Sequence, residues 1–324
     1  MYRYMKMNKI RLFLAPMAGA ADSAMRRMCR EHGADGCTTE MVSAAAVWYK
    51  DKKTFALADT EGEDDCAVQI FGHEPAMIAN AVKVLYEKAA AKPRAFDINM
   101  GCPVKKVVSN GDGSALMRDP VLAGKIIEAA VKASPVPVTV KMRLGWDREH
   151  KNCAELCRVA QESGASAVCV HGRTREDMYM PGTVDYEGIA RAKAAVGIPV
   201  TANGDIIDAP SAVRVLDVTG ADALMIGRAA LGDPFVFEKI RAGLECLPYT
   251  EPTVPERLEA AKKHLLLLIG LKGGRTGVCE GRKHMAWYTK GMPGSASLRR
   301  EMNAAATPEE MINILEKIKK RSQL

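Results

Sequence analysis

One pattern recurs along the first three quarters of the chain: a short apolar run, a polar or glycine-containing turn, then a helix-like pattern of apolar residues. Strands that alternate with helices favour a parallel sheet, because each crossover helix returns the chain to the same edge of the sheet. Eight such units within about 235 residues are typical of an α/β TIM (β/α)8 barrel. A doubly wound open sheet is the alternative, although the G-x-G-x-x-G turn usual after its first strand is absent. We expect the strands near residues 12–15, 34–39, 66–71, 95–99, 136–141, 166–171, 198–202 and 222–226.

The last quarter of the chain has a different pattern. Three prolines within residues 248–255 indicate a linker, and helical patterns follow over residues 254–271 and 308–320. Thr307 precedes the second of these as a candidate N-cap, with proline at the first helical position and acidic residues in the first turn. We therefore predict two domains, a barrel over residues 1–245 and a small C-terminal helical domain over residues 246–324.

The positive charge of the chain is concentrated in that C-terminal part. The net charge is +7, and residues 251–324 hold 14 Lys and Arg against 8 Asp and Glu, whereas the remaining residues are nearly neutral. Residues 282–290 also mix basic with aromatic side chains, a combination that suits RNA. The alternative is an ordinary helical bundle with a solvated basic surface and with Trp and Tyr in its core.

Composition excludes several other classes of protein. No apolar run approaches the roughly 20 residues that span a membrane, and the apolar run near residues 12–14 is too short for a signal peptide. The nine cysteines are scattered and odd in number, so we expect reduced thiols and a cytoplasmic protein. Cys153 and Cys157 share one face of a predicted helix, and no second pair at zinc-ligand spacing accompanies them. We therefore expect no metal site.

The strongest candidate for chemistry is Cys102. It follows an apolar run that ends on Asp97 and Asn99, and it sits in a Gly-Cys-Pro turn that restricts its backbone. The carboxyl ends of parallel strands carry the active sites of α/β folds. A rigidly held thiol there can be an acid, a nucleophile or a metal ligand, and the alternative is a buried structural cysteine.

Polar or charged groups follow nearly every predicted strand, which a purely structural barrel does not require. Taken alone, Lys141 could equally be interpreted as a lysine at the barrel rim, and His171 as a hydrogen-bonded histidine of the core. The turns after the seventh and eighth strands combine glycine with Arg228, as do phosphate sites of TIM barrels. The expected ring consists of Pro16, Met17, Ala18, Glu40, Gln69, Asn99, Cys102, Lys141, Arg143, His171, Arg173, Asn203, Gly204, Asp205, Gly227 and Arg228.

Across nearly its whole length the chain resembles the tRNA-dihydrouridine synthases, and it looks most like their bacterial B-type branch. The order of the matching motifs is highly specific. They are the motifs at residues 15–19, 39–43, 97–103 with 105–107, 140–143, 171–175, 202–205 and 225–228, and Arg282-Lys283-His284 with Trp287-Tyr288.

The resemblance implies a flavin enzyme that uses FMN and NADPH, or NADH, to reduce uridines in tRNA. Cys102 would give a proton to C5 of the uracil after hydride transfer to C6. Asn99 and Arg173 would hold the uracil, while Lys283 and Arg299 of the helical domain would contact tRNA. The implied FMN-binding residues are Pro16, Met17, Ala18, Gln69, Lys141, His171, Asn203, Gly204, Asp205, Gly227 and Arg228.

Two departures from the family pattern are visible, at Ala21 and at Asp112, and the second could alter the loop near the substrate. A flavin barrel that acts on a free pyrimidine and a non-catalytic RNA-binding barrel are the remaining alternatives. We expect a monomer without membrane or metal partners. The target uridine and the choice between NADPH and NADH stay open.

Overall fold

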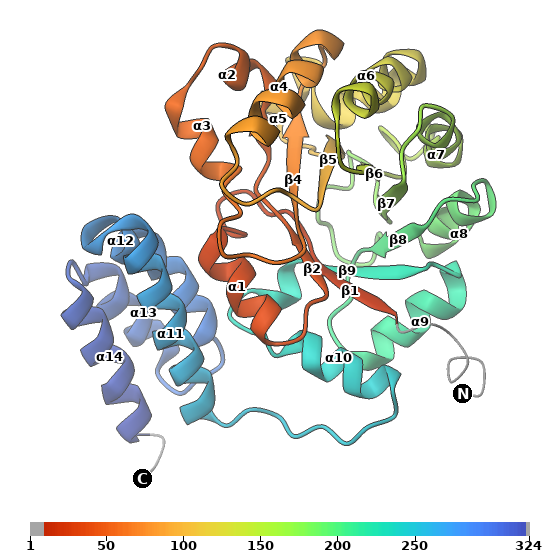
Figure 1. The fold of residues 1–324 in the computed structure, drawn as a ribbon. Helices are drawn as coiled ribbons and strands as arrows, with labels where there is room; N and C mark the ends of the chain where they lie inside the picture. Colours follow the sequence, from red (N-terminus) through yellow and green to blue (C-terminus); the bar gives the residue numbers. More distant parts are fainter. Residues whose placement is uncertain (1–9, 322–324) are drawn as a thin grey trace.

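The structure is a computed structural model that describes residues 10–321. Eight parallel strands close into a barrel with helices around it (Figure 1). The barrel closes because β1 pairs with both β2 and β9, while β2 also pairs with β4. The predicted TIM barrel is thereby confirmed. The strands are β1 (Arg11–Leu14), β2 (Gly36–Thr38), β4 (Cys66–Phe71), β5 (Ala95–Met100), β6 (Val138–Arg143), β7 (Ala167–His171), β8 (Val200–Asn203) and β9 (Ala223–Ile226), with a short added strand, β3 (Val42–Ser43), beside the end of β4.

The second strand is shorter than the sequence predicts. The apolar run was expected to span residues 34–39, but β2 begins only at Gly36. Asp35 lies outside the strand because its carboxylate accepts the N–H of Leu12 at 2.7 Å and pairs with Arg241. Gly36 is required where β2 starts, since a Cβ there would lie 2.9 Å from the carbonyl oxygen of Asp65.

Helices cover the outer face of the barrel (Figure 1). Pro75 and Pro120 begin two of them at or near the first helical position, where a missing N–H costs nothing. The helices of the barrel are α1 (Ser23–Glu31), α2 (Ala44–Trp48), α3 (Lys52–Leu57), α4 (Pro75–Lys88), α5 (Lys105–Val108), α6 (Pro120–Ala133), α7 (Cys153–Glu162), α8 (Tyr186–Ala194), α9 (Ala209–Thr219) and α10 (Val236–Leu244), with 3-10 helices at Gly113–Arg118 and Arg228–Ala230.

Alternation along the strands separates the apolar core from the barrel interior. On β6, Val138, Val140 and Met142 are buried in the core that lies between strands and helices. Thr139 and Lys141 point the other way, because successive side chains of a strand face opposite sides. The barrel interior therefore carries polar side chains. Those near the carboxyl ends of the strands, such as Lys141, line the mouth of the barrel.

A four-helix unit follows the barrel and packs beside α1 (Figure 1). It consists of α11 (Val254–Lys272), α12 (Gly274–Tyr288), α13 (Ser295–Ala304) and α14 (Pro308–Arg321). The unit has its own apolar core, which also takes in Met28 of α1. The predicted N-cap is confirmed, since Thr307 Oγ1 accepts the N–H of Glu310 at 3.2 Å.

The prediction that the cysteines are unpaired thiols is confirmed. All nine cysteines are free thiols. Cys153 and Cys157 lie buried on the inner face of α7, as predicted for one face of a helix. None of the helices within residues 10–321 is long and apolar enough to cross a membrane.

Candidate active site

Cys102 is held at the mouth of the barrel by the residues on either side of it. Asn99, at the end of β5, accepts the N–H groups of Gly101 and Cys102 on its Oδ1 at 3.1 and 2.9 Å. The hydroxyl and the N–H of Ser114 both donate to the carbonyl oxygen of Cys102. The backbone of the thiol is therefore fixed from both sides, while its side chain stays half-buried.

The environment of Cys102 keeps its thiol protonated. Burial raises its pKa above the ordinary value, and this outweighs the N–H of Val104 and the positive charge of Arg143, which both favour the thiolate. A thiol with a raised pKa is a poor nucleophile at neutral pH and a competent proton donor.

A buried hydrogen-bonded chain orients Asn99. Asp97 accepts the side-chain amide of Gln69 at 2.7 Å and the hydroxyl of Thr139 at 2.6 Å. The Nδ2 of Asn99 donates in turn to Oε1 of Gln69 at 2.8 Å. Burial raises the pKa of Asp97 against the opposing effect of these bonds. Sequence reasoning missed this role of Asp97, although a carboxyl within an apolar strand must find hydrogen-bond donors.

Replacing Gly113 with alanine is expected to displace Cys102. Gly113 has a φ of +61°, and a Cβ on it would lie 2.9 Å from the carbonyl oxygen of Cys102 and 3.1 Å from its Cβ. We expect the rate of the reaction catalysed at the mouth to fall at least about tenfold, because a shift of the order of 1 Å in a reacting group is costly. Gly182→Ala is the matched control, since Gly182 has a φ of +73° and no atom of the described residues lies within 4 Å of the added Cβ. Equal activity of the two variants would contradict the contact.

Lys141 and His171 face the barrel interior from neighbouring strands. The Nζ of Lys141 donates to Oδ1 of Asn203 at 3.1 Å, and no carboxylate pairs with this lysine among residues 10–321. Burial lowers the pKa of His171 well below its ordinary value, and the charges of Lys141 and Arg143 lower it further. In the described part of the chain, the mouth thus holds a cation without an ion-pair partner beside a neutral imidazole.

Asp205 lies between two arginines. Its carboxylate accepts both terminal nitrogens of Arg173 at 3.0 and 2.6 Å and pairs with Arg228 at 2.8 Å. Arg173 has no exposed surface and also donates to the carbonyl of Met180 and the hydroxyl of Thr183. These contacts occupy much of the guanidinium of Arg173, so it ties two loops together, and its predicted contact with a uracil stays a prediction.

The turns after β8 and β9 have backbone shapes that suit the close approach of a ligand. Gly204 has a φ of +132°, and a Cβ on it would lie 3.1 Å from Val184 and 3.3 Å from the His171 ring. Asp205 has a φ of +45°, in the left-handed region. Arg228 begins a 3-10 helix directly after Gly227 and is about half exposed. A phosphate at these turns would meet the exposed guanidinium of Arg228, but not the carboxylate of Asp205, whose charge is of the same sign.

The turn after β1 reaches the same mouth. Pro16 and Met17 are half-buried and Ala18 is exposed. Met17 packs on a small interior cluster of Ala15, Cys169 and Met225, and its sulfur would lie 3.9 Å from a Cβ on Gly227. The structure therefore brings the expected residues of the first and last strands together.

Sequence reasoning missed the aromatic side chain of Tyr179 at the mouth. Its ring lies 5.4 Å from the guanidinium carbon of Arg143 and 5.1 Å from that of Arg228, and its centroid is 6.3 Å from that of His171. Arg143 anchors this loop by donating to the carbonyls of Thr174 and Met178, and it also donates to Gly101. The sequence signal that could have found Tyr179 is the Met-Tyr-Met run at residues 178–180. All three side chains are exposed, and a group of exposed apolar side chains commonly marks a binding site.

Asp112, one of the two positions that depart from the family pattern, contacts a side chain nearby. The carboxylate of Asp112 contacts Nδ1 of His73 at 2.8 Å, which ties the loop after Cys102 to the turn after β4. A cavity of about 660 Å³ lies beside this pair, lined also by Met41, Phe71 and Lys106. Asp112 thus braces the loop that follows Cys102.

The two basic residues predicted for RNA lie on the helical unit. Lys283 is half-buried on α12 and Arg299 is exposed on α13. Among residues 10–321 no hydrogen bond or ion pair of either side chain is found. Tyr288 is fully buried in the core of the unit, as the alternative of a helical bundle requires. The aromatic residues of this segment are therefore not all available to RNA bases.

Comparison with known proteins adds to this geometry. The family model described as dihydrouridine synthase (Dus) matches residues 13–323. The chain belongs to the dihydrouridine synthase family. It is 43% identical over 298 residues to the tRNA-dihydrouridine synthase B of Pseudomonas aeruginosa, an alignment that covers 90% of this chain and 88% of the relative. It is 40% identical over 310 residues to the protein of that name from Pasteurella multocida, with 95% and 92% covered. The resemblance inferred from the sequence motifs is confirmed.

Proposed function

We propose that this dihydrouridine synthase reduces the C5=C6 bond of specific uridines in tRNA, with FMN at the barrel mouth and NADPH or NADH as the electron donor. Family membership supports the reaction. The observation that carries the site assignment is the thiol of Cys102, held protonated at the mouth that also contains the cation of Lys141. An acid and a cation at one mouth suit the reduction of an electron-poor ring.

The residues at the mouth fit a flavin mononucleotide. When bound, FMN supplies the hydride. Lys141, which forms no ion pair with a carboxylate among residues 10–321, would hold negative charge on the reduced ring. Gly204, Gly227 and Arg228 would hold the phosphate through backbone and guanidinium. Contacts to the ring and its side chain are assigned to Pro16, Met17, Ala18, Gln69, His171 and Asn203, while Asp205 keeps Arg228 in place.

Cys102 has the role of proton donor. After hydride arrives at C6 of the uracil, the proton on Sγ passes to C5, which leaves a saturated C5–C6 bond. Asn99 positions this thiol through the N–H groups of Gly101 and Cys102, and Arg173 positions Asp205 and the loop that carries Tyr179. Both residues thus act through others. The target uridine must leave its stack to reach Sγ at the mouth.

The helical domain, residues 246–324, is assigned to tRNA binding, and the barrel, residues 1–245, to catalysis. Replacing Lys283 and Arg299 together with alanine should weaken tRNA binding, because each side chain that neutralises a phosphate releases counterions. We expect the slope of log K against log salt concentration to become shallower by about 0.7–0.9 for each phosphate that is no longer neutralised. Fluorescence anisotropy with unmodified tRNA over a salt series measures this slope. Lys132→Ala on α6 serves as the control, since Lys132 is exposed on the barrel. A slope equal to that of the unmodified protein would remove these two residues from the interface.

The reaction itself is tested with tRNA from cells that lack the gene. Position-resolved mass spectrometry should show loss of dihydrouridine at defined positions relative to the parent cells. Purified protein with FMN, NADPH and this tRNA should restore it, and a parallel assay with NADH identifies the preferred donor. Reduction of free uridine with no effect on tRNA would contradict the proposal and favour a free pyrimidine as substrate.

A further inference from the structure

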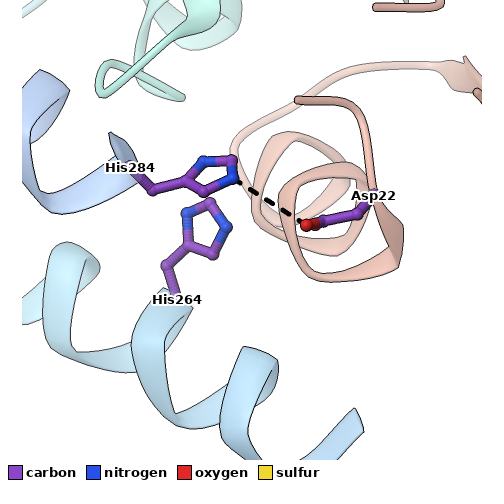
Figure 2. Close-up of side chains that lie close together, drawn as sticks. All are labelled: Asp22, His264 and His284. Carbon is purple, nitrogen blue, oxygen red and sulfur yellow. Dashed lines mark ion pairs between the residues drawn. The ribbon is translucent and has the colours of Figure 1, made fainter. Parts of the chain in front are cut away.

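A cluster of three potential metal ligands lies between the barrel and the helical unit. Asp22 is the N-cap of α1, His264 lies on α11, and His284 lies on α12. Their ligand atoms are all within 4.8 Å of one another, and Nε2 of His284 lies 3.8 Å from Oδ2 of Asp22. Figure 2 shows the two imidazole rings side by side with the carboxylate facing them. Among residues 10–321 this is the only such group of three.

The two histidines are buried without enough hydrogen-bond partners. Neither ring is exposed, and within the described residues Nε2 of His264 and both nitrogens of His284 have no hydrogen bond. Buried polar nitrogens of this kind are rare in proteins because each forfeits its hydration. A metal ion placed between the rings would take the lone pair of one nitrogen from each of them, and so would give a partner to two of these three atoms.

The orientation of His264 suits such a ligand. Nδ1 of His264 lies 3.3 Å from the hydroxyl of Tyr288, which leaves Nε2 free to point into the cluster. An outer hydrogen bond of this type commonly orients a metal-bound histidine.

We propose that Asp22, His264 and His284 bind one divalent transition-metal ion of the zinc class. Two imidazoles and one carboxylate form a donor set that zinc uses in proteins when a water molecule completes the tetrahedron. Zinc–ligand bonds near 2.0–2.2 Å require the three ligand atoms to move together by roughly 1 Å. The ion would join the start of α1 to two helices of the C-terminal unit, so it would fasten the catalytic barrel to that unit.

Two lysines, Lys272 and Lys283, bring positive charge near the two histidines, and Lys272 also contacts a proposed ligand directly. The Nζ of Lys272 is 3.3 Å from Oδ2 of Asp22, and the same amine pairs with Glu280. Because the Lys272 side chain is partly exposed, it can keep Glu280 as its partner and leave Asp22 to the ion. Removing this amine should therefore strengthen metal binding.

The test uses the full-length protein, stripped with a chelator and titrated with Zn²⁺ and Co²⁺. We expect elemental mass spectrometry to find one bound metal ion per chain, and Co²⁺ to give the absorption spectrum of a tetrahedral site. Excess Zn²⁺ should raise the Tm by roughly 5 °C. Asp22→Asn keeps the N-cap of α1 but removes the charge, and with His284→Gln it should lower metal affinity more than about 100-fold. Lys272→Gln should raise the affinity.

The control is His150→Gln, which removes an exposed histidine that pairs with Asp147 far from the cluster in the sequence. This variant should bind Zn²⁺ as the unmodified protein does. Flavin content and circular dichroism report whether each variant is folded. A folded protein that binds no stoichiometric Zn²⁺ or Co²⁺, or variants Asp22→Asn and His284→Gln that bind as tightly as the parent, would overturn the proposal.

Discussion

Replacing Cys102 with alanine is expected to slow dihydrouridine formation by about 10²–10⁴-fold, the usual contribution of a positioned general acid. The thiol is the half-buried group that Asn99 and Ser114 hold at the mouth, and its raised pKa keeps the transferable proton on Sγ. Alanine removes the proton but leaves the backbone contacts of Cys102 intact. A single-turnover assay with reduced protein and unmodified tRNA isolates the step that follows flavin reduction.

The control for this variant is Cys246→Ala, which removes an exposed thiol outside the mouth. It should react at the rate of the unmodified protein, and both variants should retain flavin. A Cys102→Ala protein that reacts as fast as the control would exclude Cys102 as the acid.

The pH dependence of the same step follows from the direction of the Cys102 shift. The protonated thiol is the active form, and burial raises its pKa above the ordinary value. The single-turnover rate should therefore stay level through neutral pH and fall only on the alkaline side, above the usual range of a cysteine. Cys102→Ser should lose this alkaline limb, because a serine hydroxyl does not ionise there. A fall in rate centred below the ordinary thiol pKa would contradict the assignment.

Replacing Glu63 with alanine is expected to lower the free energy of unfolding by about 3–5 kcal/mol. The side chains of Arg26 and Glu63 are 3% and 1% exposed, and two bonds of 2.6 Å join the guanidinium to the carboxylate. The same guanidinium donates to the carbonyls of Ala21 and Asp59, so it links α1 to the loop before β4. Removing Glu63 leaves a buried positive charge without its partner. Urea unfolding followed by circular dichroism measures the loss.

A matched exposed pair separates burial from pairing. Lys132 and Glu128 form an ion pair on α6 with side chains that are 72% and 54% exposed. Glu128→Ala should change the free energy of unfolding by no more than about 0.5 kcal/mol, because water already solvates both charges. Equal losses in the two variants would show that burial does not decide the strength of the Arg26–Glu63 pair.

Much of the site could be predicted because its signals are local. The Gly-Cys-Pro turn that carries Cys102 and the glycines at residues 204 and 227 mark strand ends by their own backbone chemistry. The pairing of Arg173 with Asp205 could not be predicted in this way. Its bidentate pairing with Asp205 depends on how two loops meet after the barrel closes.

The sequence by itself determined the fold class, the order of the strands, the position of Cys102 at a strand end and the family. These follow from the period of apolar residues and from turn chemistry, which act over a few residues. Only the tertiary structure decided that β3 adds to the end of β4, that Tyr179 lies between Arg143 and Arg228, and that Asp22 meets His264 and His284. These contacts join residues far apart in the chain, and their geometry depends on how whole elements pack rather than on any local pattern.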